Sequence, residues 1–508
     1  MSEAARIPAD DAWPECDSAP SADTTGSGGE SERDRLRYAW KALSVTSLGM
    51  LLTGLNSSTL NVALPEIVRH FHAGPFAANW VLLAYMLVTS VSLVVFGRVA
   101  DLFGRRGTYL AGFAVFTASS LLLGFAPNIG VLIVLRVTQA LGGAMILANG
   151  SAIITHAFPA SRLSQGMGAY MAVISVGQLV GPSVGGFVAG VAGWQWIFWF
   201  NVPIGIAAIV WGAVSLRRVP ADGGERLDVP GIVVLWIWLG GLLLALSEGS
   251  ARGWGGPLVI GGAVAFAVGL PVFWYLQRRA AAPVIDPRLF ADRSFTTANI
   301  AAVLNTLSRF SVILLVALYL QSARGYGPAE AGVAVLPMPG AMTVASLLAG
   351  GMSRRFAPRA VAVAGSAVAT AGLVVLYFAV QPSTPYVVLV PALVLIGAGS
   401  GLFLTANTTV IMADAPRDRL GVVNGIRLML VNVSTMLSTG LCLAIAASAL
   451  AREDRGFVYS GDITSAPKAI VSELLSGYER AIVVLLALSI LATIASYISR
   501  RGDTPSTP

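Results

Sequence analysis

Apolar runs of roughly 20 residues recur along this chain from Trp40 onward, with short polar breaks between them. A helix needs about this length to cross the hydrocarbon core of a bilayer, since each residue advances it by only ~1.5 Å. Helices also satisfy their own backbone hydrogen bonds, which lipid cannot do. We therefore expect an all-α integral membrane protein.

The apolar runs predict fourteen membrane-spanning helices. Their expected ranges are 41–64, 79–99, 108–126, 129–153, 165–191, 196–216, 229–248, 257–277, 296–320, 330–352, 360–380, 386–412, 422–449 and 480–499. The composition agrees, because 55% of the residues are hydrophobic and 12% are charged, whereas soluble domains carry about 25% charged residues.

The expected helices form two blocks of six with a pair between them, a pattern that indicates two related halves. The predicted organisation is a disordered cytoplasmic tail at 1–37, an N-terminal six-helix bundle at 38–218, two inserted helices with linkers at 219–295, a C-terminal six-helix bundle at 296–500 and a cytoplasmic tail at 501–508.

Basic residues in the connections predict the orientation. Most of them, including Arg105, Arg106, Arg217 and Arg218, fall on the side that holds the N-terminus. Cytoplasmic loops retain positive charge, so we expect a multi-pass protein of the plasma membrane with both termini in the cytoplasm. The net charge of +7 is scattered between apolar runs, which argues against a nucleic-acid partner. No phosphate-loop or metal-ligand spacing occurs, so we expect no cofactor, no metal and no enzyme activity.

The break between the second and third spans reads GRVADLFGRRG and includes Gly97, Asp101, Gly104, Arg105 and Arg106. Glycine permits a tight turn, and the charged groups can bridge neighbouring helix ends. A plain positively charged loop is the simpler interpretation. The spacing also suits a latch, an inner gate that forms in one conformation and breaks in another.

The GRVADLFGRRG stretch resembles the loop signature of the major facilitator superfamily. The stretches WQWIFWFNVPIG, in the sixth span, and GVVNGIRLMLVNVSTMLSTG, near the C-terminus, resemble signatures of its fourteen-span drug:proton antiporter branch, so the resemblance covers about residues 51–440. It implies the major facilitator fold, two six-helix bundles plus two inserted helices. It also implies multidrug or antibiotic efflux by alternating access, driven by the proton gradient.

The fourth span places Arg136 and Gln139 on one helix face. An arginine at membrane depth is costly, so it indicates a polar cavity or a structural hydrogen-bond anchor. The pair resembles the fourth-helix motif of the family, with Ala140 in place of its glycine. We expect Arg136 and Gln139 to line the translocation path.

The fifth span contains the sequence GQLVGPSVGGFVAG, with Gly177, Gly181 and Gly185 at every fourth position, followed by Gly186 and interrupted by Pro182. Small residues at this spacing let helices approach closely, and ordinary packing would account for them. These five residues match the fifth-helix signature of exporters in the family, which favours export over uptake.

The first span contains LNSSTLNVALP, and a polar run of this kind favours a path-facing surface, which includes Asn56 and Asn61. The resemblance places an aspartate at position 56 in the drug-exporting branch. An asparagine cannot carry a proton. If transport is coupled to protons, the candidate carriers are therefore other acids, namely Asp101, Glu66, Glu248 and Glu330.

Three arginines, Arg136, Arg309 and Arg427, fall well inside the spans, and no acid accompanies them at comparable depth. We expect Arg309 to face the path, and we expect a small-molecule substrate that is a neutral or anionic amphiphile. Two alternatives stay open, namely uptake or facilitated transport of a metabolite and a non-transporting membrane sensor.

Overall fold

The computed structural model describes residues 32–73, 75–218, 228–252, 255–280, 283–353, 355–381, 384–416, 419–449 and 468–500. Within these ranges the chain is helical and has no strand, which confirms the all-α prediction. Helix α1 begins at Glu32, inside the expected tail, because Glu32 and Asp34 in its first turn favour a helix N-terminus. The rest of that tail, residues 450–467 and the tail after Arg500 lie outside the described ranges.

The N-terminal half contains α1 to α7. Their bounds are α1 Glu32–His70, α2 Pro75–Phe103, α3 Arg105–Leu123, α4 Ile129–Ala157, α5 Leu163–Ala192, α6 Trp196–Trp199 and α7 Asn201–Ser215. The turn between α2 and α3 is made by Gly104, whose φ of 99° favours glycine. The side chain of Asn128 caps α4 by accepting a hydrogen bond from the Val131 amide at 2.9 Å.

The C-terminal half repeats this plan. Its helices are α10 Arg293–Arg309, α11 Val312–Arg324, α12 Pro328–Ala334, α13 Pro337–Met352, α14 Pro358–Ala379, α15 Tyr386–Ala413, α16 Leu420–Ser448 and α18 Lys468–Arg500. Gly112 packs on Gly142 between α3 and α4, and Gly365 packs on Gly399 between α14 and α15. The same close glycine contact thus occurs at corresponding positions in both halves.

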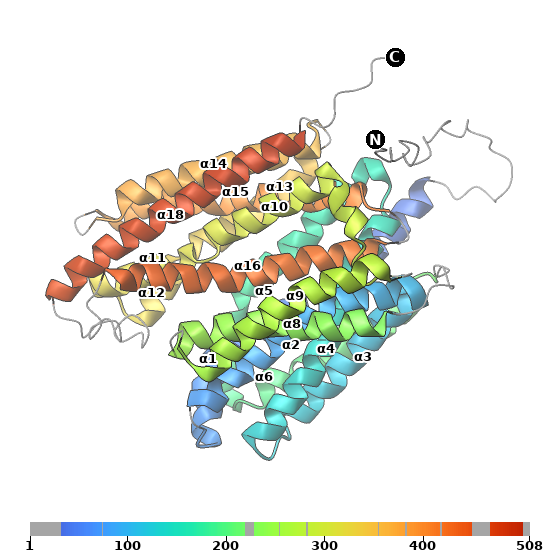
Figure 1. Cartoon of the computed structure of the whole chain (residues 1–508), viewed down its shortest axis with the longest axis horizontal. Coiled ribbons are helices and arrows are strands. Elements are labelled where there is room, and N and C mark those ends of the chain that lie inside the picture. Colours follow the sequence, from blue (N-terminus) through green and yellow to red (C-terminus); the bar gives the residue numbers. More distant parts are fainter. Residues whose placement is uncertain are drawn as a thin grey trace, which may run out of the picture.

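The two helices between the halves, α8 (Val229–Arg252) and α9 (Pro257–Arg279), pack against each other. Helix α8 also contacts α2 of the first half and α16 of the second, so the pair lies against both halves (Figure 1). Helix α9 contacts α8 and turns exposed side chains such as Ile260, Val264 and Val268 outward.

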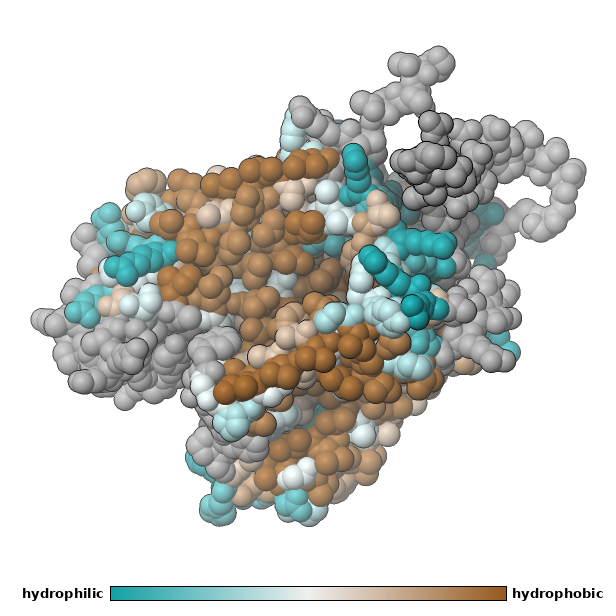
Figure 2. Space-filling model, in the orientation of Figure 1, coloured by the Kyte–Doolittle hydropathy of each residue, from teal (hydrophilic) through white to brown (hydrophobic). Residues whose placement is uncertain are grey.

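On the face that Figure 2 shows, apolar side chains cover the helices between two polar ends. In the described part of the chain, 11 helical stretches are long and apolar enough to cross a membrane. These observations confirm a multi-pass membrane fold. A helix lies at each of the expected spans, and the count of fourteen crossings stays a prediction.

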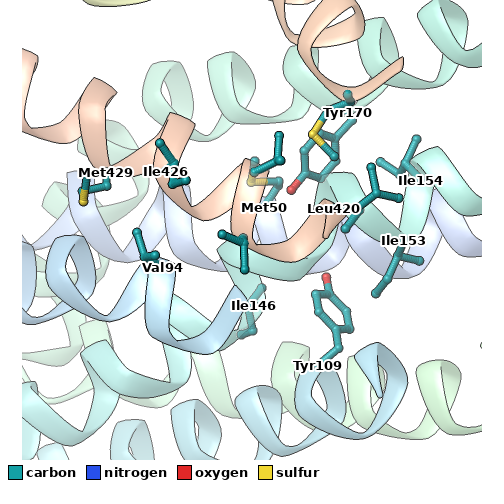
Figure 3. Packing of buried hydrophobic residues seen from close by; sticks show 14 of the residues in the cluster. Met50, Val94, Tyr109, Ile146, Ile153, Ile154, Tyr170, Leu420, Ile426 and Met429 are labelled. Atoms are coloured by element: carbon teal, nitrogen blue, oxygen red, sulfur yellow. The ribbon is translucent and has the colours of Figure 1, made fainter. Parts of the chain in front are cut away.

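The halves meet mainly through α2 with α16 and α5 with α13. Side chains from both halves form one buried cluster, with Val94 and Ile146 beside Leu420 and Ile426 (Figure 3). The first residues of α1 and the last residues of α18 lie toward the same end of the molecule (Figure 1). We name this end, which holds the start of α1 and the end of α18, the inner end.

Candidate functional site

Arg136 is buried at the centre of the N-terminal half, with 1% of its surface exposed. Its Nη1 donates to Gln139 Oε1 at 2.6 Å and to Asn56 Oδ1 at 3.2 Å, and its Nε donates to the Val81 carbonyl at 3.4 Å. Its guanidinium carbon lies 4.3 Å from the ring centroid of Tyr85. The structure therefore brings Asn56, Arg136 and Gln139 together, with side-chain oxygens and a π face as partners for the cation.

A hydrogen bond from a neighbouring helix holds Gln139, one of the partners of Arg136, in place. Gln139 Nε2 donates to Ser120 Oγ at 2.8 Å, which ties α4 to α3 and turns the amide oxygen toward Arg136. The Nδ2 group of Asn56 is buried without a hydrogen-bond partner among the described residues. Asn61 lies on α1, and its side chain is outside the described part of the structure.

Arg309 lies in the other half, at the break where α10 ends and before α11 begins at Val312. Its Nη1 lies 3.9 Å from the sulfur of Met342, and its Nε is buried without a hydrogen-bond partner in the described part of the chain. A thioether is a weak acceptor. Among the described residues, Arg309 thus has a weak acceptor at Nη1 and a buried Nε that makes no hydrogen bond.

Arg427 of α16 lies at the seam between the halves. It donates to Thr408 Oγ1 at 3.3 Å and to Asn424 Oδ1 at 3.0 Å. Asn424 in turn donates to the carbonyls of Leu147 and Ala148 on α4, at 3.0 and 2.7 Å. Asn424 therefore joins the halves directly, and Arg427 orients its amide.

Among the described residues, no carboxylate forms an ion pair with any of the three embedded arginines. The candidate proton carriers differ in burial. Asp101 and Glu248 are buried, with 9% and 2% of their surfaces exposed, whereas Glu66 is half-buried and Glu330 is exposed.

At the inner end, Asp101 of α2 caps the first turn of α16. Its Oδ1 accepts from the Gly421 amide at 3.1 Å, and its Oδ2 accepts from the Val422 amide at 3.0 Å. Arg105 donates to the same Oδ1 from Nε and Nη2, at 3.1 and 3.0 Å. A carboxylate at a helix N-terminus satisfies free amides and complements the helix dipole.

The contact between α2 and α16 also requires glycine at position 97. A Cβ at Gly97 would overlap the carbonyl group of Gly421, so glycine at both positions lets α2 and α16 touch. Arg106 points to the first half instead and donates to the Ala213 carbonyl at 2.6 Å. We name Asp101, Arg105, Gly97, Gly421 and Val422 the inner latch.

The glycine stripe of α5 faces α1 inside the N-terminal half. A Cβ on Gly177 would lie 3.5 Å from Gly54, an ordinary contact, whereas one on Gly185 would lie 2.7 Å from the Cα of Thr59. Gly181 is buried, while the side-chain surroundings of Pro182 and Gly186 are outside the described part of the structure. The stripe lets two helices of one bundle approach closely.

Sequence reasoning missed Tyr85, Ser120 and the role of Asn424. An aromatic or a serine within an apolar span has the pattern of ordinary core packing. One signal was present, because Tyr85 and Thr89 are four residues apart and so share a helix face. Thr89 donates to the Ala140 carbonyl of α4, next to Gln139.

Comparison with known proteins agrees with this geometry. Residues 46–439 match the family model described as Major Facilitator Superfamily. The chain is 33% identical over 385 residues to the multidrug resistance protein Stp of Mycobacterium tuberculosis, covering 76% of this chain and 71% of that protein. It is 29% identical over 410 residues to the tetracenomycin C resistance and export protein of Streptomyces glaucescens, covering 80% and 76%.

Among solved structures, the fold resembles that of the human organic anion transporter MFSD10. The TM-score is 0.60 at 13% sequence identity, covering 89% of this chain and 99% of that one. At this identity the likeness concerns the fold alone. The predicted family and its membrane fold are confirmed, and the relatives are transporters rather than enzymes. The chain belongs to the Major Facilitator Superfamily of membrane transporters.

Proposed function

We propose that this protein exports small amphiphilic organic molecules from the cell by alternating access between its two halves. The observation that carries the transport mechanism is the inner latch. Asp101 holds α16 through two backbone amides rather than through a covalent or fully apolar contact. Such a contact breaks and re-forms at moderate cost, so a ligand that prefers the open inner end shifts the equilibrium.

Relatives named for drug resistance and antibiotic export support the direction of transport. The match of Gly177, Gly181, Pro182, Gly185 and Gly186 to the exporter signature supports it too. In this proposal the protein lies in the cell membrane with both termini in the cytoplasm, and the inner end faces the cytoplasm. The two described chain ends at the inner end are consistent with this orientation (Figure 1).

The embedded arginines support a neutral or anionic substrate. Arg136, Arg309 and Arg427 have no carboxylate partner among the described residues, so the interior carries positive charge at membrane depth. A cationic substrate would be repelled by this charge, and an anionic one would gain from it. In this proposal Asn56, Asn61, Arg136, Gln139 and Arg309 contribute to the translocation path.

Proton coupling in this protein requires a carboxylate at another position, because residue 56 is an asparagine. Asp101 links protonation to the latch, because a protonated carboxyl group is a poorer acceptor for the Gly421 and Val422 amides. Glu248 is the second candidate, since it is buried at the outer part of α8, a helix that contacts both α2 and α16.

Transport in proteoliposomes tests the proposal. The purified protein is reconstituted with a panel of amphiphiles of each charge, and movement is followed with a proton gradient imposed or collapsed. We expect faster export of neutral and anionic compounds than from empty liposomes. Asp101→Asn should reduce the gradient dependence if Asp101 is the carrier, and Glu248→Gln should do so if Glu248 is.

Three results would contradict the proposal. Inward movement that persists without any gradient would favour uptake or facilitated transport of a metabolite. Equal movement in empty liposomes for every compound would favour a non-transporting sensor. Selective export of permanent cations would contradict the charge argument.

A further inference from the structure

A cavity of about 740 Å³ lies at the inner end, in the seam between the two halves. The start of α1, the end of α4 and the start of α5 form one wall, while the end of α15, the start of α16 and the loop after α13 form the other. Small-molecule sites typically measure about 300–1,000 Å³. The cavity is therefore large enough for a drug-sized molecule that would touch both halves.

Several basic side chains line this cavity. Arg35, Arg217 and His156 line it, and none of the described residues that line it is an aspartate or a glutamate. The guanidinium carbon of Arg217 lies 4.5 Å from the ring centroid of Tyr38, which fixes the cation at the wall. Walls with charges of one sign attract a ligand of the opposite sign. The charge pattern selects an anion.

A second cavity nearby gives a useful contrast. It measures about 600 Å³ and is lined by acids and bases together, including Asp286, Asp292 and Arg419. Arg419 is already paired with Asp286. Charges of both signs at one site largely cancel at a distance, so that cavity has no comparable preference for an anion. The basic lining of the first cavity is not a general property of the inner end.

The remainder of the first cavity is apolar. Phe158, Met412 and Leu420 contribute to its walls. Most small-molecule sites combine such surface with a few polar groups that fix orientation. A ligand that matches both features has an apolar body and one anionic group.

The cavity exists only while the inner ends of the halves are together, because its walls belong to both. Ser164 of α5 donates to Ser353 after α13 at 2.6 Å, which joins the two walls. The Ser151 hydroxyl of α4 lies 3.9 Å from the sulfur of Met412 on α15. Opening of the inner end would separate these pairs and divide the site.

We propose that this cavity binds a small amphiphilic anion, with a carboxylate, sulfonate or phosphate on an apolar body, and that its binding holds the inner end closed. A ligand that binds one conformation stabilises that conformation in proportion to its occupancy. The bound anion therefore opposes the opening that alternating access requires. Binding at this site does not depend on the proposed export.

Binding is tested on the full chain in nanodiscs of phosphatidylcholine, with calorimetric titration of three matched probes. These are naphthalenesulfonate, naphthalenemethanol and naphthylmethylammonium. We expect the sulfonate to bind about tenfold more tightly than the neutral probe and the cation more weakly than both, with the preference reduced at high salt. Equal affinity for the three probes would overturn the proposal.

The basic residues are tested by Arg35→Gln and Arg217→Gln. Both side chains are exposed, so their loss does not threaten folding. We expect each variant to weaken sulfonate binding about three- to fivefold and the double variant about tenfold or more, with binding of the neutral probe unchanged. Arg37→Gln and Arg218→Gln are matched controls, because these neighbours do not line the cavity. Equal losses in the controls would contradict the site.

The effect on conformation is measured with spin labels at the inner end, on Phe103→Cys in the first half and Phe356→Cys in the second. Both positions are exposed, and Cys16→Ser and Cys442→Ala remove the native thiols. We expect the sulfonate to enrich the shorter distance. Unchanged or longer distances would overturn the proposed closure.

The source of the anion is tested by adding phosphatidylglycerol to the nanodiscs. Continued sulfonate binding supports a soluble ligand. The other outcome is that the anionic lipid abolishes sulfonate binding to the wild type but leaves the weaker sulfonate binding of the Arg35→Gln, Arg217→Gln double variant unchanged. In that case the lipid headgroups compete for the two arginines, and the cavity holds lipid headgroups. That result would overturn the assignment to a soluble amphiphile.

Discussion

Arg136 donates a hydrogen bond to the side-chain oxygen of Asn56 at 3.2 Å, so an amide rather than a carboxylate faces the buried cation of the N-terminal half. An amide satisfies one guanidinium donor but leaves the positive charge uncompensated. The net charge of this site therefore depends on whether residue 56 is an amide or a carboxylate. It follows that the preference for substrate charge can be changed at position 56 with little change in shape.

Asn56→Asp should reduce the preference for anionic over neutral substrates. The new carboxylate would lie beside Arg136 and cancel much of its field, at similar side-chain volume. We expect binding of anionic amphiphiles to weaken by about tenfold or more, and binding of neutral ones to change by less than about threefold. Equilibrium binding of a carboxylate compound and its neutral ester analogue measures both effects.

Asn149→Asp is the matched control for this change. Asn149 is also buried on the N-terminal half, and its side chain donates to the Met145 carbonyl of its own helix rather than accepting from an arginine. A carboxylate there should leave the ratio of anion to neutral binding much closer to that of the wild type. The same loss of anion binding in both variants would show that any buried acid has this effect.

Arg309→Gln should weaken binding of anions specifically. Arg309 has only the Met342 sulfur as a hydrogen-bond partner among the described residues, so removal of its charge breaks no ion pair. A hydrogen bond to a charged group contributes about 1.5–3 kcal/mol, which corresponds to a loss of roughly tenfold to a hundredfold. Binding of the same carboxylate and ester measures the change. Equal losses for both compounds would indicate a structural role instead.

Asp101→Asn should open the inner end. The amide retains one acceptor but places an NH₂ group where the carboxylate accepts from Gly421 or Val422. Loss of such a contact costs about 1–3 kcal/mol, so the closed population should fall by roughly tenfold relative to the open one. Spin-label distances at the inner end measure the two populations. Arg106→Gln is the control, since Arg106 donates to the Ala213 carbonyl of the first half.

Much of the fold follows from the sequence because lipid imposes a minimum helix length and excludes an open backbone. The interruptions within spans do not follow as easily. The breaks after Arg309 and before Pro337 both lie inside continuous apolar runs. Only the second carries a proline as a signal, so the position of Arg309 at a helix end required the structure.

The candidate site, like the fold, could be predicted from the sequence only in part. The motifs place Arg136 and Gln139 on one face because they are three residues apart, and the structure adds Asn56 to them. Contacts between distant helices depend on how the bundles pack, which spacing along one helix does not determine. The hydrogen bonds from Asn424 to the carbonyls of α4 are an example, since they join residues that lie 277 and 276 positions apart in the sequence.

Gly185→Ala should destabilise the N-terminal half, whereas Gly177→Ala should not. A Cβ at position 185 would lie 2.7 Å from the Cα of Thr59, and backbone cannot move aside as a flexible side chain does. Overpacking of this kind costs about 1–3 kcal/mol. At position 177 the added Cβ meets α1 at 3.5 Å, an ordinary contact, and alanine favours a helix by up to about 1 kcal/mol over glycine. Unfolding of the purified variants in detergent, followed by tryptophan fluorescence, measures the difference. Equal stability of the two variants would show that α1 and α5 are not held together at Gly185.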